Sequence, residues 1–190
     1  MANSTARFGF LPYGSSNQKG FGGTTAYYIP ASVSVAVAVG DVVKRTVGTN
    51  ASAIAGIPAG VLPNCTPISS DTSTAITGVV VGIMPVDPFA SKAAQGAAST
   101  ARVVYVMDDV NATFRVCADT GVTVNVGGNC GIDYSACSNG VSQLCIAASN
   151  TTATLPFHVV GVNTTPRGDT EFIVKINAST EMTGATGINS

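Results

Sequence analysis

Apolar and polar residues alternate along much of the chain, which is the pattern of β-strands that bury one face. The clearest example is residues 32–39 (SVSVAVAV), in which valine occupies every second position. Other short runs rich in valine and isoleucine are bounded by Gly, Pro, Asp or Asn, which favour turns. The pattern predicts strands at 32–39, 42–47, 75–86, 100–107, 112–118 and 171–177, and weaker strands near 54–62, 122–126, 141–147 and 157–163.

Residues 108–111 (DDVN) separate two of these expected strands. Because Asp and Asn side chains bond to neighbouring backbone in turns, we expect strands 100–107 and 112–118 to form a hairpin. The best helix candidate is the short segment 90–98 (ASKAAQGAA). About nine strands with almost no helix predict an all-β fold, either a β-sandwich or a β-barrel.

The first 26 residues differ from the rest because glycines and aromatic residues recur through them. So many glycines disfavour a helix or a central strand. Either these residues wrap back over the protein's own core, or they form an extended arm whose aromatic side chains anchor it to a partner. We divide the chain into an extended N-terminal arm (1–26), a β domain (27–178) and a C-terminal tail (179–190). The candidate partner-binding residues are Phe8, Phe10, Tyr13 and Phe21, with Tyr27 and Tyr28 at the joint.

Charged residues are scarce: they make up 10% of the 190 residues, whereas a typical soluble domain is about 25% charged. The formal net charge is −1. A weakly charged surface rich in Ser, Thr and Asn favours coverage by neighbouring subunits, which suggests a component of an assembly. Lys44 and Arg45 are the only adjacent basic residues, whereas binding to nucleic acid requires several clustered cations.

The sequence also bears on where the protein is made. Residues 2–20 contain no continuous apolar stretch of the kind found in signal peptides. The run 76–86 is interrupted by Thr, Gly and Pro, and it is far shorter than the ~20 residues of a membrane helix. We expect a protein that is made in a cytosol and does not bind a membrane.

Five cysteines and one histidine are candidates for metal binding or a disulfide. The cysteines are widely spaced, with no C-x-x-C pair, which disfavours a zinc site. One interpretation is that they are buried free thiols, and the other is one disulfide, such as Cys130 with Cys137 or Cys145. A cytosolic site of synthesis favours the free thiols.

The residues do not form a recognisable catalytic pattern. His158 lies in a strand-like run (LPFHVV), so we expect it to be hydrogen-bonded within a sheet and not a catalytic base. Asp108 and Asp109 are adjacent in a turn, where turn formation explains them better than paired acid–base chemistry. The chain contains neither a G-x-S-x-G motif nor a phosphate-binding loop. We predict no enzyme activity, no cofactor and no metal.

Several short motifs resemble one family of virus proteins. They are RFGFLP (7–12), AYYIPAS (26–32) followed by GDVV (40–43), GVVVG (78–82), RVVYVMDDVNATFRV (102–116) and the closing IVKIN (173–177). Their order resembles the decoration, or cement, proteins of tailed-phage capsids. The resemblance implies a β-sandwich or jelly-roll-like core.

The resemblance also implies a function. The protein would bind the outer surface of the major capsid shell as a dimer or trimer and stabilise joints between capsomers. Its partners would be the major capsid protein and other copies of itself, and it would reside on the virion after synthesis in the host cytoplasm. The alternatives are a tail or fibre protein, or a glycan-binding β-sandwich adhesin. The absence of Trp and the aromatic content of 6% argue against the adhesin.

Overall fold

The computed structural model describes seven stretches of the chain: residues 7–15, 23–70, 75–85, 95–119, 121–150, 155–164 and 170–177. Within these stretches it contains thirteen strands and no helix. The predicted all-β fold is therefore confirmed. None of the described segments is a helix long and apolar enough to cross a membrane.

Five strands close into a barrel in the order β2-β5-β4-β6-β8. They are β2 (Thr24–Ile29), β4 (Val42–Thr49), β5 (Pro63–Pro67), β6 (Gly78–Ile83) and β8 (Arg102–Met107). All neighbours are antiparallel except β2 and β5, which are parallel. Val43, Val80 and Val106 belong to one buried cluster of the barrel, which is dominated by β-branched side chains that suit a pleated surface.

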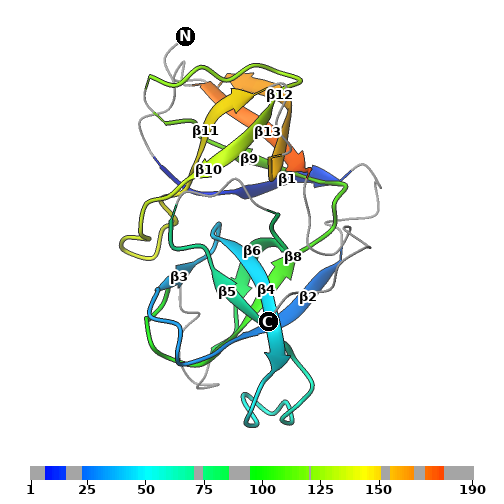
Figure 1. The fold of residues 1–190 in the computed structure, drawn as a ribbon, viewed down its shortest axis with the longest axis vertical. Helices are drawn as coiled ribbons and strands as arrows, with labels where there is room; N and C mark the ends of the chain where they lie inside the picture. The colour runs from blue at the N-terminus through cyan, green and yellow to red at the C-terminus, as the bar shows by residue number, and fades with distance from the viewer. Residues whose placement is uncertain are drawn as a thin grey trace.

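The other large unit is a six-stranded antiparallel sheet in the order β1-β9-β13-β12-β10-β11. Its strands are β1 (Leu11–Ser15), β9 (Ala112–Val116), β10 (Asn129–Asp133), β11 (Cys145–Asn150), β12 (Phe157–Thr164) and β13 (Thr170–Ile176). The short strands β3 (Val37–Ala38) and β7 (Gln95–Gly96) form a separate pair. In Figure 1 the sheet covers one side of the barrel, and β1 runs along the side of the sheet nearest the barrel.

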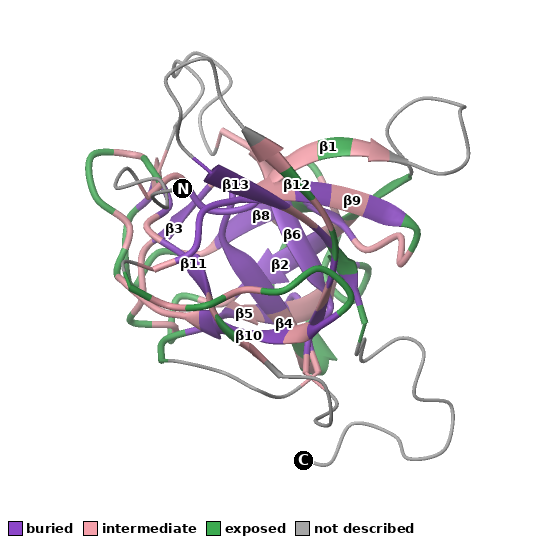
Figure 2. Cartoon of the chain, turned by 90° about the horizontal axis from the view of Figure 1, so that it is seen from above, coloured by how far each residue is buried: buried purple, intermediate pink, exposed green. Residues whose placement is uncertain are grey.

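The barrel and the sheet share one continuous core. Strand register places Val42, Val79 and Met107 in a row across the barrel wall. These three side chains lie in the same buried cluster as Phe114 and Phe157 of the sheet. Seen from above in Figure 2, where the two units overlap, the buried residues gather in the central strands, including β6, β8 and β13. The interface is therefore packed like a domain interior.

The strand predicted at 32–39 is wrong for most of its length. Only Val37–Ala38 forms a strand, because Val33 N donates a hydrogen bond to Pro30 O (3.1 Å) in a turn. The strand near 54–62 is reduced to a single bridge around Ala55 and Gly56, which both have positive φ angles (49° and 81°) and form a tight turn.

Strands β1, β2, β5 and β10 were not among the predicted strands. Strand β5 begins and ends with proline, which lacks the N–H of a sheet ladder and made this segment resemble a loop. Strand β10 lies at Asn129–Asp133, where the sequence NCGID shows little alternation. Residues 122–126 form no strand, although one was expected there. Strand β11 begins at Cys145 instead of residue 141.

The predicted hairpin between 100–107 and 112–118 is also wrong. The turn itself is present, since Asn111 N donates to Asp109 Oδ1 (2.8 Å). However, β8 pairs with β2 and β6, whereas β9 pairs with β1 and β13. The turn therefore leads the chain out of the barrel and into the sheet.

Other predictions fall partly or wholly outside the described residues. In the expected helix 90–98, residues 95–96 form β7, which contradicts a helix there, and residues 90–94 are not described. The tail 179–190 is not described either. The boundary between arm and domain at residue 26 lies inside β2.

Candidate functional site

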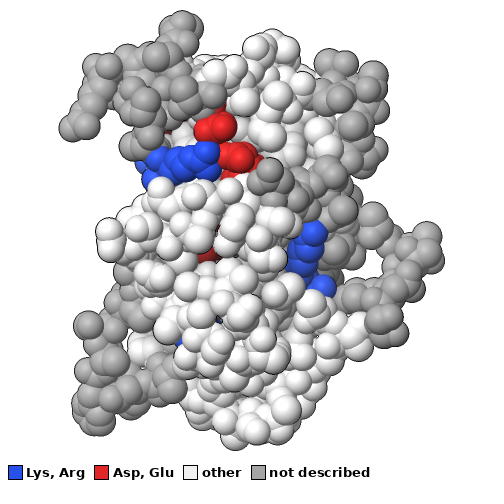
Figure 3. Space-filling model, turned by 60° about the vertical axis from the view of Figure 1, so that its left-hand side comes forward, with Lys and Arg blue, Asp and Glu red and all other residues white. Residues whose placement is uncertain are grey.

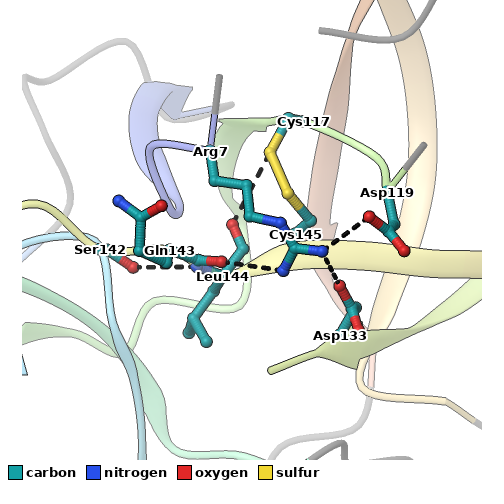
Figure 4. Close-up of a disulfide and its surroundings, with 8 residues drawn as sticks. All are labelled: Arg7, Cys117, Asp119, Asp133, Ser142, Gln143, Leu144 and Cys145. Atoms are coloured by element: carbon teal, nitrogen blue, oxygen red, sulfur yellow. Dashed lines mark hydrogen bonds and ion pairs between the residues drawn. A yellow bond between two sulfur atoms is a disulfide. The ribbon is translucent and has the colours of Figure 1, made fainter. Parts of the chain in front are cut away.

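Residues 7–15, which we call the N-terminal segment, begin with Arg7. Its side chain binds Asp133 of β10 and Asp119, which follows β9 (Figure 4). Its Nη2 forms ion pairs of 2.6 Å with Asp119 Oδ1 and with Asp133 Oδ2, and its Nη1 donates to Gln143 O (3.2 Å). Burial lowers the pKa of Arg7, but hydrogen bonds and charges from the two aspartates outweigh burial and raise it overall. The guanidinium therefore links the N-terminal segment to three residues that lie at least 112 positions further along the chain.

A disulfide between Cys117 and Cys145 lies beside Arg7 and joins the end of β9 to the start of β11. The Cα–Cα distance of 5.1 Å is typical of disulfides. The pairings suggested from sequence, which used Cys130, are wrong. Cys130 and Cys65 are buried free thiols, and burial raises the pKa of each to about 12.

Phe10 inserts into the protein's own core. Its ring is fully buried and stacks on Phe157, with the ring centroids 4.4 Å apart. Its backbone N donates to Gly40 O (2.9 Å). Gly9 has a positive φ of 73°, and a side chain at this position would collide with Ser142. Glycine therefore lets the segment pass closely between the barrel and the sheet.

The other predicted anchors have different environments. Tyr27 and Tyr28 are buried, and the Tyr27 hydroxyl donates to Asp108 Oδ2 (3.2 Å). Like Phe10, these two tyrosines stabilise the protein's own core in this structure. Phe8 is half-buried, and Tyr13 is 53% exposed. A role in partner binding stays a prediction for Phe8 and Tyr13, and Phe21 lies outside the described residues.

Strand β1 lies at an edge of the sheet, beside an apolar cavity. Among the described residues, β1 pairs with β9 alone. The cavity has a volume of about 510 Å³ and lies between β1 and the barrel. We call it the β1 groove, and its lining residues are Leu11, Pro12, Thr24, Val81, Met107 and Arg115.

The opposite edge of the sheet, β11, is covered by residues 117–119 and 121–125. Ile146 N donates to Cys117 O (3.0 Å), and Ser149 N donates to Thr123 O (3.1 Å). The disulfide holds the start of this covering segment against β11. Since backbone groups at this edge are already paired, we do not consider it a docking surface.

His158 makes a hydrogen bond within the sheet, as predicted: its Nδ1 lies 2.9 Å from Asn129 Oδ1. In the part of the chain that the structure describes, no three His, Cys, Asp or Glu side chains gather as a metal site would require. The face in Figure 3 carries only a few charged side chains on a mostly uncharged surface. The β1 groove is therefore the candidate functional site.

No family model matches the chain, and no curated protein or solved structure matches it significantly. Function is therefore inferred from the chain's own residues. The sequence motif RFGFLP pointed to the N-terminal segment, but it did not identify the partners of Arg7, which lie 112 or more residues away.

Proposed function

We propose that this chain is a non-enzymatic structural protein of a virus particle. It binds the outside of the major capsid shell of a tailed phage and stabilises the joints between capsomers. The observation that carries the proposal is the open edge of β1 beside an apolar groove, because such an edge can bind a neighbouring chain. The weakly charged surface and the sequence resemblance support the same function.

The mechanism is an increase in stability through binding. A protein that binds the assembled shell more tightly than its free subunits shifts the equilibrium towards the shell. Many copies on one particle add their contributions, and self-association into dimers or trimers strengthens each attachment through avidity. The ion pairs of Arg7 and the buried ring of Phe10 attach the residues before β1 to the rest of the domain, so a partner bound at β1 would be joined to the folded core.

Localisation within purified particles tests this proposal. Mass spectrometry of purified virions, with immunogold electron microscopy, should find the protein on capsid heads. Shells that carry the protein should also rupture at a higher temperature than shells from which it has been removed. Label on tails or fibres would favour the alternative virion component, and absence from particles would refute the proposal.

A further inference from the structure

We propose that the β1 groove receives an extended segment of a neighbouring protein that adds a strand to β1. The segment places an apolar side chain against the barrel and a carboxylate beside Arg115. In the capsid setting this inference rests on the proposed function, and the neighbour is then the major capsid protein. The shape and chemistry of the groove favour an extended segment with an acidic residue even if the proposed capsid function is set aside.

The position of the groove favours an extended occupant. Its lining residues come from β1 and β9 of the sheet on one side and from β2, β6 and β8 of the barrel on the other. A segment in the groove would therefore run alongside the backbone of β1, where strand pairing provides main-chain hydrogen bonds. Leu11 pairs with Arg115 across the β1–β9 ladder, so their side chains share one face. Leu11 on the edge strand and Arg115 on its neighbour therefore line the groove from the same face of the sheet.

Two bulges lie at this surface. The register between β1 and β9 skips Tyr13, and the register between β6 and β8 skips Val81. A bulge turns the extra side chain away from the regular ladder. Tyr13 is exposed, and Val81 is half-buried in the wall of the groove. Both positions offer side-chain contacts to an occupant.

The edge of β1 does not favour indiscriminate strand pairing. The strand is short, it contains a bulge, and Pro12 lacks an N–H. These features limit aggregation through an open edge. Backbone pairing alone is therefore weak, and the groove must provide most of the affinity and selectivity. Val81 and Met107 supply an apolar surface that selects an apolar side chain.

Arg115 supplies the charge selectivity. It is the only charged residue among the described groove residues, and its side chain is 40% exposed. Its Nε pairs with Glu171 Oε2 at 3.4 Å, and the ring of Phe8 lies 5.7 Å from its Cζ atom. The two terminal nitrogens carry four further N–H donors in a planar fork that matches a carboxylate. We therefore expect Asp or Glu in the bound segment.

A displayed library of random linear 12-residue peptides tests the groove without the capsid. Selection on the wild-type chain should enrich peptides with alternating apolar residues and one acidic residue. Leu11→Glu, which places a negative charge in the groove next to the expected carboxylate, should weaken binding of a selected peptide at least about tenfold. Circular dichroism and the urea midpoint of the variant establish that it folds. Failure to enrich peptides, or equal binding by folded Leu11→Glu, would overturn the inference.

A pair of variants tests the role of Arg115. Glu171→Gln is the matched control, because it removes the internal partner of the guanidinium and keeps the arginine. Adding Arg115→Gln in that background should abolish the preference for acidic peptides and reduce affinity about tenfold. An unchanged preference would overturn the carboxylate assignment.

Two further results separate this inference from the proposed function. If the chain selects peptides but is absent from virions, the groove inference stands and the proposed capsid function is refuted. If the chain is found on virions but selects no peptides, the capsid function stands and the groove inference is refuted. Sedimentation equilibrium, which measures the oligomeric state, tests whether a second copy of the chain occupies the β1 groove. If the chain dimerises and Leu11→Glu abolishes the dimer, the assignment to a different protein would be overturned.

Discussion

The two edges of the six-stranded sheet are built differently. At β11, residues 117–119 and 121–125 lie along the strand and bond to its backbone, and a disulfide links Cys117 to the start of β11. At β1, the described chain provides no such cover, and an apolar groove lies beside the strand. An edge without cover can pair with another chain, whereas a covered edge cannot. The difference makes β1, and not β11, the edge at which we propose contact.

The largest expected effect comes from detaching the N-terminal segment. Phe10→Ala should reduce the free energy of unfolding by about 3–5 kcal/mol, because it leaves a cavity where the ring stacks on Phe157. Tyr13→Ala, in the same strand region but exposed, should change it by less than about 0.5 kcal/mol. Urea denaturation measures both. Equal effects would mean that Phe10 does not anchor β1.

Breaking the disulfide should affect the β11 edge selectively. Replacing Cys117 and Cys145 together by serine should cost about 3 kcal/mol, because the bond closes a loop with a sequence separation of 28. Hydrogen exchange at the amides of Ile146 and Ser149 should accelerate, while exchange at β1 stays unchanged. Cys137→Ser, which alters a half-buried free thiol, is the control. Faster exchange at β1 instead would show that the two edges are not independent.

Arg7→Gln should have an intermediate effect. The variant loses two short ion pairs of a partly buried guanidinium, and we expect a loss of about 1–2 kcal/mol. Part of this contribution should disappear from the wild type in 1 M salt, because screening weakens partly exposed pairs. Lys175→Gln removes an exposed charge and should cost less than about 0.5 kcal/mol. If Arg7→Gln lowers the free energy of unfolding no more than Lys175→Gln does, the ion pairs of Arg7 do not stabilise the N-terminal segment.

The smallest effect concerns Asp41, which joins the barrel to the loop before β11. Burial raises its pKa above the ordinary value, although hydrogen bonds from Ser142 and from Ala38 N partly oppose this. The folded chain therefore holds this proton more tightly than the unfolded chain. Its contribution to the free energy of unfolding is greatest below the ordinary pKa and is lost as the pH rises towards the folded pKa. Asp41→Asn should flatten the fall in stability just above pH ~4, measured by urea midpoints; an unchanged slope would contradict this.

Sequence patterns predicted turns and the fold class, but they failed to predict strand pairing, which depends on contacts between residues far apart in the chain. The all-β class and the Asp109 turn were predicted correctly, because alternation and turn residues are local signals. A hydrogen-bonded His158 was also predicted correctly, but its partner Asn129 lies 29 residues away and was not foreseen. The hairpin prediction failed because β8 and β9 find their partners in different sheets. Alternation at 32–39 overestimated a strand that Pro30 and a turn interrupt.

The candidate site was only partly predictable. Glycine and aromatic residues drew attention to the N-terminal segment, but Phe10 binds the chain's own core. The groove combines residues from β1, β2, β6, β8 and β9, and no sequence spacing reveals such a surface. Likewise, the partners of Arg7 are set by the topology of the sheet.

Hydrogen exchange of the two edges, measured on the free chain and on purified capsids that carry it, tests the central claim most directly. We predict that the β1 amides exchange rapidly in the free chain and slowly on the capsid, while the β11 amides are protected in both. Unchanged exchange at β1 on the capsid, or new protection confined to β11, would contradict the assignment of β1 as the docking edge.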